Sequence, residues 1–134
     1  MNESISIFLV DDHRIFTQSF QVFVSLQERF TWRGSSAGDR RTIADILHFR
    51  PSVVLMDYHL PGIDGLETTR RIRAAERDGR RVAVIGVTAS ASLADRESCL
   101  AAGMDDYVPK PVGLADLGAA PRGGRLAPEP CRRA

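Results

Sequence analysis

The chain has 134 residues, of which 43% are hydrophobic and 26% are charged, and its formal net charge is +1. This length suits one domain with a single core, and the balanced charge gives no indication of a strongly charged partner such as nucleic acid. No apolar run approaches the roughly 20 residues of a membrane span, no basic segment typical of a signal peptide opens the chain, and only Cys99 and Cys131 are present, so the cytoplasm is the expected location.

The first part of the chain alternates strand-like and helix-like patterns. Residues 5–10 (ISIFLV) form an apolar run that predicts a strand buried on both faces. A stripe at helical spacing predicts the first helix: Phe16, Phe20, Phe23 and Val24. Residues 30–32 alternate and predict a short edge strand. Three apolar residues then predict a second helix, for which Asp39 is a candidate start signal: Ile43, Ile46 and Leu47.

The middle of the chain continues the alternation. Residues 53–56 (VVLM) predict a third buried strand. Asp64 is followed three residues later by Glu67, which resembles a capping box and predicts a third helix running to about Arg77. Residues 82–87 (VAVIGV) predict a fourth buried strand.

The same signals recur before the end of the chain. Ser92 and Asp95 form another helix start signal, and Gly103 is a plausible stop, so a fourth helix is expected between them. Residues 107–108 predict a short fifth strand. Residues 111–117 (PVGLADL) can begin a fifth helix, whereas the glycines and prolines of residues 118–134 predict a disordered tail.

Apolar strands separated by helices are typical of a parallel sheet covered on both faces, a doubly wound α/β fold. The predicted domain spans residues 1–117. In such a sheet, ligands bind at the carboxyl ends of the strands. Those ends carry a hydroxyl, an ammonium and three carboxylates: Thr88, Lys110, Asp11, Asp12 and Asp57.

Three neighbouring carboxylates repel one another, and a divalent cation relieves the repulsion. Oxygen ligands without cysteine favour Mg²⁺ over zinc. A metal, an ammonium and a hydroxyl together suit a phosphoryl group. In that setting the carboxylate of Asp57 can be a nucleophile that forms an acyl phosphate.

Each of these residues also has a purely structural interpretation. Asp12 could cap the first helix, and Asp57 could be a polar strand terminator. Thr88 could make a local backbone hydrogen bond, Lys110 could be a solvated surface lysine, and Tyr107 could be a half-buried strand aromatic. Their convergence at one edge favours the chemical interpretation. The three histidines show no metal-ligand spacing and are expected to be structural or exposed: His13, His48 and His59.

Four stretches carry a family resemblance: LVDDHRIF, VVLMDYHLPGIDGLETTRRIR, VIGVTA and CLAAGMDDYVPKPV. Over about residues 4–117 the chain resembles the receiver domain of two-component response regulators. The first stretch is similar to regulators with a helix-turn-helix output domain, and the last to receivers attached to hybrid histidine kinases. The resemblance implies a flavodoxin-like five-stranded parallel sheet of order 2-1-3-4-5. Here the fifth helix is expected to be short or missing.

The resemblance also implies a role for each site residue. Asp57 would accept a phosphoryl group from a phosphohistidine of a sensor kinase or phosphotransfer protein. Four groups would hold Mg²⁺: Asp11, Asp12, Asp57 and the backbone carbonyl of His59. The phosphoryl group would be bound by Lys110, Thr88 and the backbone amide of Ala89. Thr88 and Tyr107 would form the switch that reports phosphorylation.

The leading hypothesis is a phosphorylation-controlled signalling switch that acts through contact with an unidentified downstream protein. Its self-catalysed phosphotransfer and dephosphorylation would be incidental, so the chain is not expected to be an enzyme. A homodimer through the fourth helix and fifth strand stays open, although a shortened fifth helix would weaken that face. Neither direct nucleic-acid binding nor membrane binding is expected.

Two alternatives belong to other classes of protein. The chain could be a constitutive interaction or scaffolding module whose switch is degenerate. It could instead be a Mg²⁺-dependent hydrolase that uses Asp57 on small phosphoesters. The hydrolase ranks last, because no second acid or base stands beside Asp57 in the sequence.

Overall fold

The computed structural model describes residues 4–58, 64–76, 79, 81–88 and 92–110. Strands and helices alternate through these ranges, and each expected element within them is present. The strands are β1 (Ile5–Val10), β2 (Phe30–Ser36), β3 (Val53–Asp57), β4 (Ala83–Thr88) and β5 (Asp106–Pro109). The helices are α1 (Arg14–Ser25), α2 (Thr42–Phe49), α3 (Gly65–Ala75) and α4 (Leu93–Ala102).

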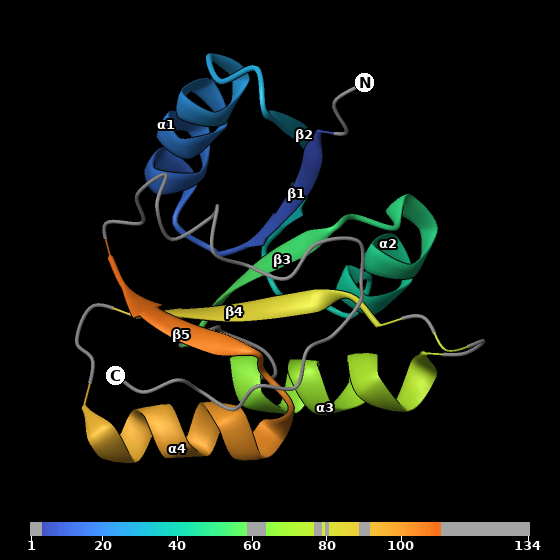
Figure 1. The fold of residues 1–134 in the computed structure, drawn as a ribbon, viewed down its shortest axis with the longest axis vertical. Coiled ribbons are helices and arrows are strands. Elements are labelled where there is room, and N and C mark those ends of the chain that lie inside the picture. Colours follow the sequence, from blue (N-terminus) through green and yellow to red (C-terminus); the bar gives the residue numbers. More distant parts are fainter. Residues whose placement is uncertain (1–3, 59–63, 77–78, 80, 89–91, 111–134) are drawn as a thin grey trace.

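All strand pairings in the sheet are parallel, and the strand order is β2-β1-β3-β4-β5, as predicted. Figure 1 shows the sheet crossing the molecule, with α1 on one side and α3 and α4 on the other. Strands β1, β3, β4 and β5 are successive neighbours. Their carboxyl ends therefore lie side by side at one edge of the sheet.

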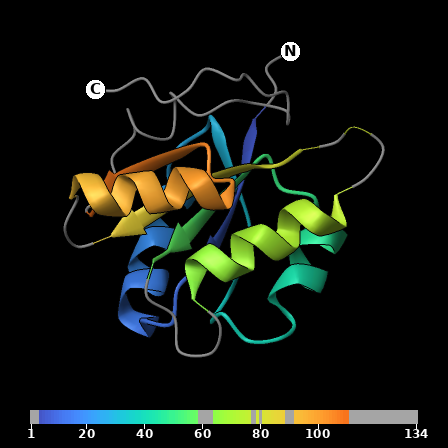
Figure 2. The same ribbon diagram turned by 90° about the horizontal axis from the view of Figure 1, so that it is seen from below.

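The core has two layers because successive side chains of a strand point to opposite faces. From β1, Ile7 and Leu9 pack with Phe20 and Val24 of α1. Phe8 and Val10 point the other way, into a layer that includes residues from the other three helices: Ile46, Ile72 and Cys99. Figure 2, turned by 90°, looks onto the face of the sheet that α3 and α4 cover. Because side chains from the helices cover both faces of the sheet, apolar residues are required at every position of the central strands.

Strand β2 is longer than the predicted 30–32. It continues to Ser36 through a bulge, since Ile7 pairs with Trp32 while Phe8 pairs with Gly34. Gly34 has φ of 151°, and a Cβ at this position would lie 3.4 Å from the Phe8 ring. Glycine and serine are strand breakers in a sequence pattern. The extension at this edge was therefore missed.

Two helix start signals are confirmed by hydrogen bonds. The Asp64 side chain accepts from the Glu67 amide at 2.8 Å, and the Ser92 hydroxyl accepts from the Asp95 amide at 3.1 Å. Gly103 ends α4 with φ of 112°, which is the left-handed conformation that favours glycine.

The other helix boundaries differ from prediction. The N-cap of α1 is His13 rather than Asp12, so the interpretation of Asp12 as the cap is wrong. Helix α2 begins at Thr42, and Asp39 instead accepts a hydrogen bond from the Arg41 amide in the preceding turn. Helix α3 ends at Ala75 rather than near residue 77.

A network of ion pairs ties the end of α3 to the sheet edge opposite the strand ends. Arg73 and Arg81 each place a guanidinium nitrogen 2.9 Å from a carboxylate oxygen of Asp105. Arg73 also pairs with Glu76 at 3.0 Å. The Val84 amide donates to Asp105 at 2.9 Å. The side chains of Arg73 and Asp105 are only 14% and 13% exposed, so this network is largely withdrawn from water.

Residues 111–117 and 118–134, for which a short fifth helix and a disordered tail are predicted, lie outside the described residues. Within the described ranges, none of the helices combines the length and the apolar character needed to cross a bilayer.

Candidate functional site

The carboxyl ends of four neighbouring strands bring together the residues that the sequence singled out. Asp11 follows β1, Asp57 ends β3, Thr88 ends β4 and Lys110 follows β5. Backbone bonds continue the sheet at this edge, because the Lys110 amide donates to the Thr88 carbonyl at 2.7 Å. His59 and Ala89, whose backbone groups were predicted to bind metal and phosphoryl, lie outside the described residues.

An acidic cluster forms where β1 and β3 end. Asp11 and Asp57 are 4% and 5% exposed, whereas Asp12 lies at the surface. Potential ligand atoms of Asp11, Asp12, His13 and Asp57 all lie within 4.8 Å of one another. Three carboxylates at this separation repel one another unless positive charge is present. The donor set therefore fits a divalent metal ion.

Lys110 supplies positive charge within the protein. Its Nζ lies 3.1 Å from Asp11 Oδ2 and 3.9 Å from Asp57 Oδ1. The same nitrogen lies 4.6 Å from the centroid of the Phe16 ring, a cation–π arrangement. The side chain is 24% exposed, so Lys110 is not a freely solvated surface lysine. The helix stripe gave Phe16 a core position, but its contact with Lys110 was not predicted.

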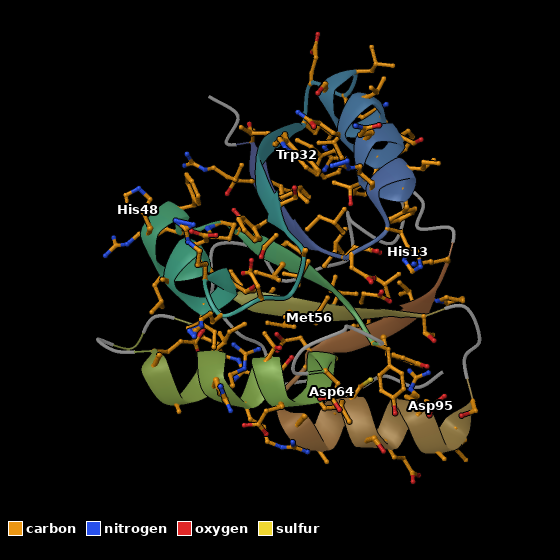
Figure 3. All side chains as sticks on the ribbon, turned by 180° about the vertical axis from the view of Figure 1, so that it is seen from behind. His13, Trp32, His48, Met56, Asp64 and Asp95 are labelled. Carbon is orange, nitrogen blue, oxygen red and sulfur yellow. The ribbon has the colours of Figure 1, made fainter. Side chains whose placement is uncertain are left out.

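His13 belongs to this cluster, which the sequence reasoning missed. Its Nδ1 lies 3.0 Å from Asp11 Oδ1 and 3.5 Å from Asp12 Oδ1. In Figure 3, His13 and Asp95 lie toward the edge where the strands end, and His48 lies on the far side. Spacing rules for metal ligands look for separated residues. The signal available in the sequence was three consecutive ligand-type residues directly after a buried strand.

Thr88 and Tyr107 form a buried pair on neighbouring strands. Each is 4% exposed, so Tyr107 is more buried than a half-buried strand aromatic. Burial raises the pKa of the Tyr107 hydroxyl, although its hydrogen bond with the Thr88 side chain acts in the opposite direction. A movement of Thr88 would therefore change the environment of Tyr107 directly.

Tyr58 connects the residue after Asp57 to α4. Its hydroxyl donates to Asp95 Oδ1 at 3.3 Å, and its ring meets the Tyr107 ring edge-on with centroids 6.4 Å apart. Burial and then the Asp95 carboxylate raise the pKa of the Tyr58 hydroxyl. No local pattern indicates this contact, since its two partners lie 37 residues apart in the chain.

The start of α3 packs directly against the backbone of Asp57. A Cβ at Gly65 would lie 2.4 Å from the Asp57 carbonyl oxygen, closer than real Cβ atoms come. The Gly65 amide donates to the Tyr58 carbonyl at 3.3 Å. Only glycine fits at this close approach, so Gly65 helps to set the position of the Asp57 backbone.

Comparison with known proteins identifies the family. The profile of the response regulator receiver domain matches residues 7–122. The response regulator MprA of Mycolicibacterium vanbaalenii is 34% identical over 117 residues, which cover 84% of this chain and 47% of MprA. The virulence sensor protein BvgS of Bordetella bronchiseptica is 37% identical over 122 residues, which cover 85% of this chain and 9% of BvgS. The chain thus spans about half of MprA and a small part of BvgS.

Solved structures agree with this assignment. The receiver domain of the sensor histidine kinase PA1611 from Pseudomonas aeruginosa PAO1, solved with a magnesium ion coordinated in its active site cleft, is 34% identical, with a TM-score of 0.72. The match covers 87% of this chain and 93% of that domain. A LuxR-family regulator from Aurantimonas sp. SI85-9A1 is 28% identical, with a TM-score of 0.75 and coverage of 87% and 81%. The chain therefore belongs to the response regulator receiver domain family.

Proposed function

We propose that the chain is a phosphorylation-controlled signalling switch in which Asp57 accepts a phosphoryl group from a phosphohistidine of a sensor kinase or phosphotransfer protein. The observation that carries this proposal is the position of Asp57 in the cluster. Its carboxylate is buried beside Asp11, with the Lys110 ammonium 3.9 Å away. A nucleophilic carboxylate next to a fixed positive charge is suited to an incoming phosphoryl group.

In the proposed transfer, an Asp57 carboxylate oxygen bonds to phosphorus as the phosphorus–nitrogen bond of the donor breaks. The bonding electron pair leaves with the donor imidazole. The Lys110 ammonium pairs with the phosphoryl oxygens, and the Thr88 hydroxyl and the Ala89 amide donate to them. Magnesium, held by Asp11, Asp12, Asp57 and the His59 carbonyl, would supply further positive charge to the phosphoryl oxygens.

The proposed output follows from the Thr88–Tyr107 pair. If Thr88 turns its hydroxyl toward the phosphoryl group, its hydrogen bond with Tyr107 is lost. Tyr107 is then free to change its packing between β5 and α4, which shifts the population of surfaces that a downstream protein reads. A switch that receives its phosphoryl group from a sensor kinase works in the cytoplasm. Slow hydrolysis of the acyl phosphate is incidental to its signalling role.

The test is single-site labelling. The protein is incubated with Mg²⁺ and acetyl phosphate, and its intact mass is measured. The proposal expects one added phosphoryl group that requires Mg²⁺ and is absent from Asp57→Asn. Asp64→Asn is the matched control, because this exposed residue caps α3 outside the cluster and Asn can also cap. A protein that no small donor or cognate kinase labels would overturn the proposal in favour of a constitutive module, and continuous phosphoester turnover would favour a hydrolase.

A further inference from the structure

The imidazole of His13 is turned toward the acidic cluster rather than away into water. Its Nδ1 lies within 3.0 Å of Asp11 and 3.5 Å of Asp12. The side chain is 65% exposed, so close packing does not force this orientation. Attraction between the ring nitrogen and the carboxylates of Asp11 and Asp12 explains why the His13 ring has this orientation.

Helix capping does not account for the position of this side chain. His13 is the N-cap of α1, but its side chain makes no capping hydrogen bond. Its backbone amide donates to Asp11 Oδ1 at 2.8 Å, which anchors residue 13 beside the cluster whatever the side chain does. The imidazole is thus an additional donor placed among the three carboxylates, with ligand atoms all within 4.8 Å.

A donor set of three carboxylates and one imidazole has a preference among metals. Mg²⁺ is bound by oxygen ligands and keeps much of its water. An imidazole nitrogen suits first-row transition ions better than it suits Mg²⁺, and Mn²⁺ is the first-row ion that shares the preference of Mg²⁺ for carboxylate oxygen. A nitrogen ligand added to an oxygen site therefore strengthens Mn²⁺ binding much more than Mg²⁺ binding.

We propose that His13 coordinates the divalent ion at this site through a ring nitrogen and makes the site selective for Mn²⁺ over Mg²⁺. The inference rests on the proposed function for the presence of a metal at the site. To the three carboxylate ligands it adds the His13 imidazole as a fourth side-chain ligand, and it specifies which metal ion the site prefers. The contacts that Nδ1 makes with Asp11 and Asp12 would be exchanged for a bond to the metal.

A weaker role for His13 makes a different prediction. If the imidazole only orients Asp11 by a hydrogen bond, its removal weakens Mn²⁺ and Mg²⁺ binding alike. If it is a ligand, its removal affects Mn²⁺ selectively. The ratio of the two affinities therefore separates ligation from orientation.

The first measurement is calorimetric titration of the full chain with each ion. His13→Ala is expected to weaken Mn²⁺ binding by about tenfold or more and to leave Mg²⁺ binding nearly unchanged. His48→Ala is the matched control, because it removes an exposed imidazole from α2, far from the cluster. The variant should fold, since neither the anchoring backbone hydrogen bond nor a cap depends on the ring. Equal losses for both ions in His13→Ala would overturn the proposal.

The second measurement does not depend on activity. Pulsed electron paramagnetic resonance of the Mn²⁺-bound protein should detect coupling to a directly bound nitrogen, and ¹⁵N-labelled histidine should change the coupling pattern. The coupling should persist in His48→Ala and vanish in His13→Ala. Mn²⁺ and Mg²⁺ binding without any histidine coupling would overturn this inference while leaving the phosphoacceptor proposal standing. Failure of both ions to bind would overturn both proposals.

Discussion

The hydroxyl of Tyr58 donates a hydrogen bond to Asp95 Oδ1 at 3.3 Å, which joins the residue after Asp57 to the first turn of α4. The backbone amide of Asp95 is itself held by the Ser92 cap at 3.1 Å. Asp95 is therefore fixed to the helix start and to Tyr58 at once. These two hydrogen bonds connect the end of β3 to α4 without involving Thr88.

The first prediction concerns this link. Tyr58→Phe keeps the ring but removes the hydroxyl, so we expect it to cost about 1 kcal/mol of stability and to loosen the first turn of α4. Hydrogen exchange of amides at the start of α4 should become faster, while exchange in α3 should not change.

The control for this link is a double-mutant cycle with Asp95→Ala, which removes the acceptor oxygen and should therefore cost less in the Tyr58→Phe background than in the unmodified protein. Additive effects of the two substitutions would show that the 3.3 Å contact does not couple Tyr58 to α4.

The second prediction concerns Gly65. Its Cβ would meet the Asp57 carbonyl oxygen at 2.4 Å, and backbone cannot rotate away as a side chain can. We expect Gly65→Ala to destabilise the fold by about 1 to 3 kcal/mol and to slow phosphoryl labelling of Asp57 in the folded fraction. Thermal unfolding and intact mass measure the two effects.

Gly86→Ala is the matched comparison. The nearest atoms to a Cβ there belong to side chains rather than backbone, with the sulfur of Met104 at 2.7 Å and a ring carbon of Tyr107 at 3.1 Å. We expect a smaller loss of stability than in Gly65→Ala and no direct effect on the Asp57 backbone. Equal labelling rates in Gly65→Ala and the unmodified protein would contradict the proposed role of this close approach.

The sequence was informative where short-range rules decide the structure. Apolar runs located the strands, and the residue after each run marked the strand end, so Asp57 and Lys110 could be assigned to one edge of the sheet from the sequence alone. Side-chain caps at Asp64 and Ser92 also depend only on neighbours three residues away. Strand β2 was too short in the prediction, because its bulge at Gly34 depends on the ring of Phe8 in another strand.

Two of the contacts missed at the site join residues that are distant in sequence. The third involves His13, to which spacing rules for separated metal ligands do not apply. Phe16 in α1 contacts Lys110, which follows β5, and the periodicity of a single helix does not predict a contact with another element. The link between Tyr58 and Asp95 likewise depends on how α4 packs on the sheet. His13 was visible beside Asp11 and Asp12, but only the fold shows that its ring turns toward them.

The third prediction concerns the network opposite the site. Asp105 accepts from Arg73, Arg81 and the Val84 amide. Asp105→Ala would leave a mostly buried guanidinium and a backbone amide without this acceptor, so we expect a loss of about 2 to 4 kcal/mol in urea unfolding.

Glu67→Ala is the control for the network, because Glu67 pairs with Arg70 and Arg71 on the exposed surface of α3. Water screens such pairs, so little change is expected. Similar losses in Asp105→Ala and Glu67→Ala would mean that burial does not strengthen the network.

The fourth prediction concerns the balance of charge in the cluster. Lys110 Nζ lies 3.1 Å from Asp11, which is 4% exposed. Lys110→Ala removes the only ammonium that the described residues place there, so we expect a loss of about 1 to 3 kcal/mol in the presence of a chelator. Added Mg²⁺ should then raise the melting temperature more than it does in the unmodified protein, because the ion becomes the main source of positive charge.

Asp57→Asn should show the opposite pattern. It removes one of the repelling carboxylates, so the protein should be more stable than the unmodified chain under chelator, by an amount on the order of 1 kcal/mol, and should gain less from Mg²⁺. Thermal unfolding with and without Mg²⁺ measures both variants. Lys110 is the chain's only lysine, so a ¹⁵N-lysine side-chain signal can follow its ammonium during the titration. If Mg²⁺ raises the melting temperatures of Lys110→Ala, Asp57→Asn and the unmodified protein equally, then repulsion in this cluster does not govern metal binding.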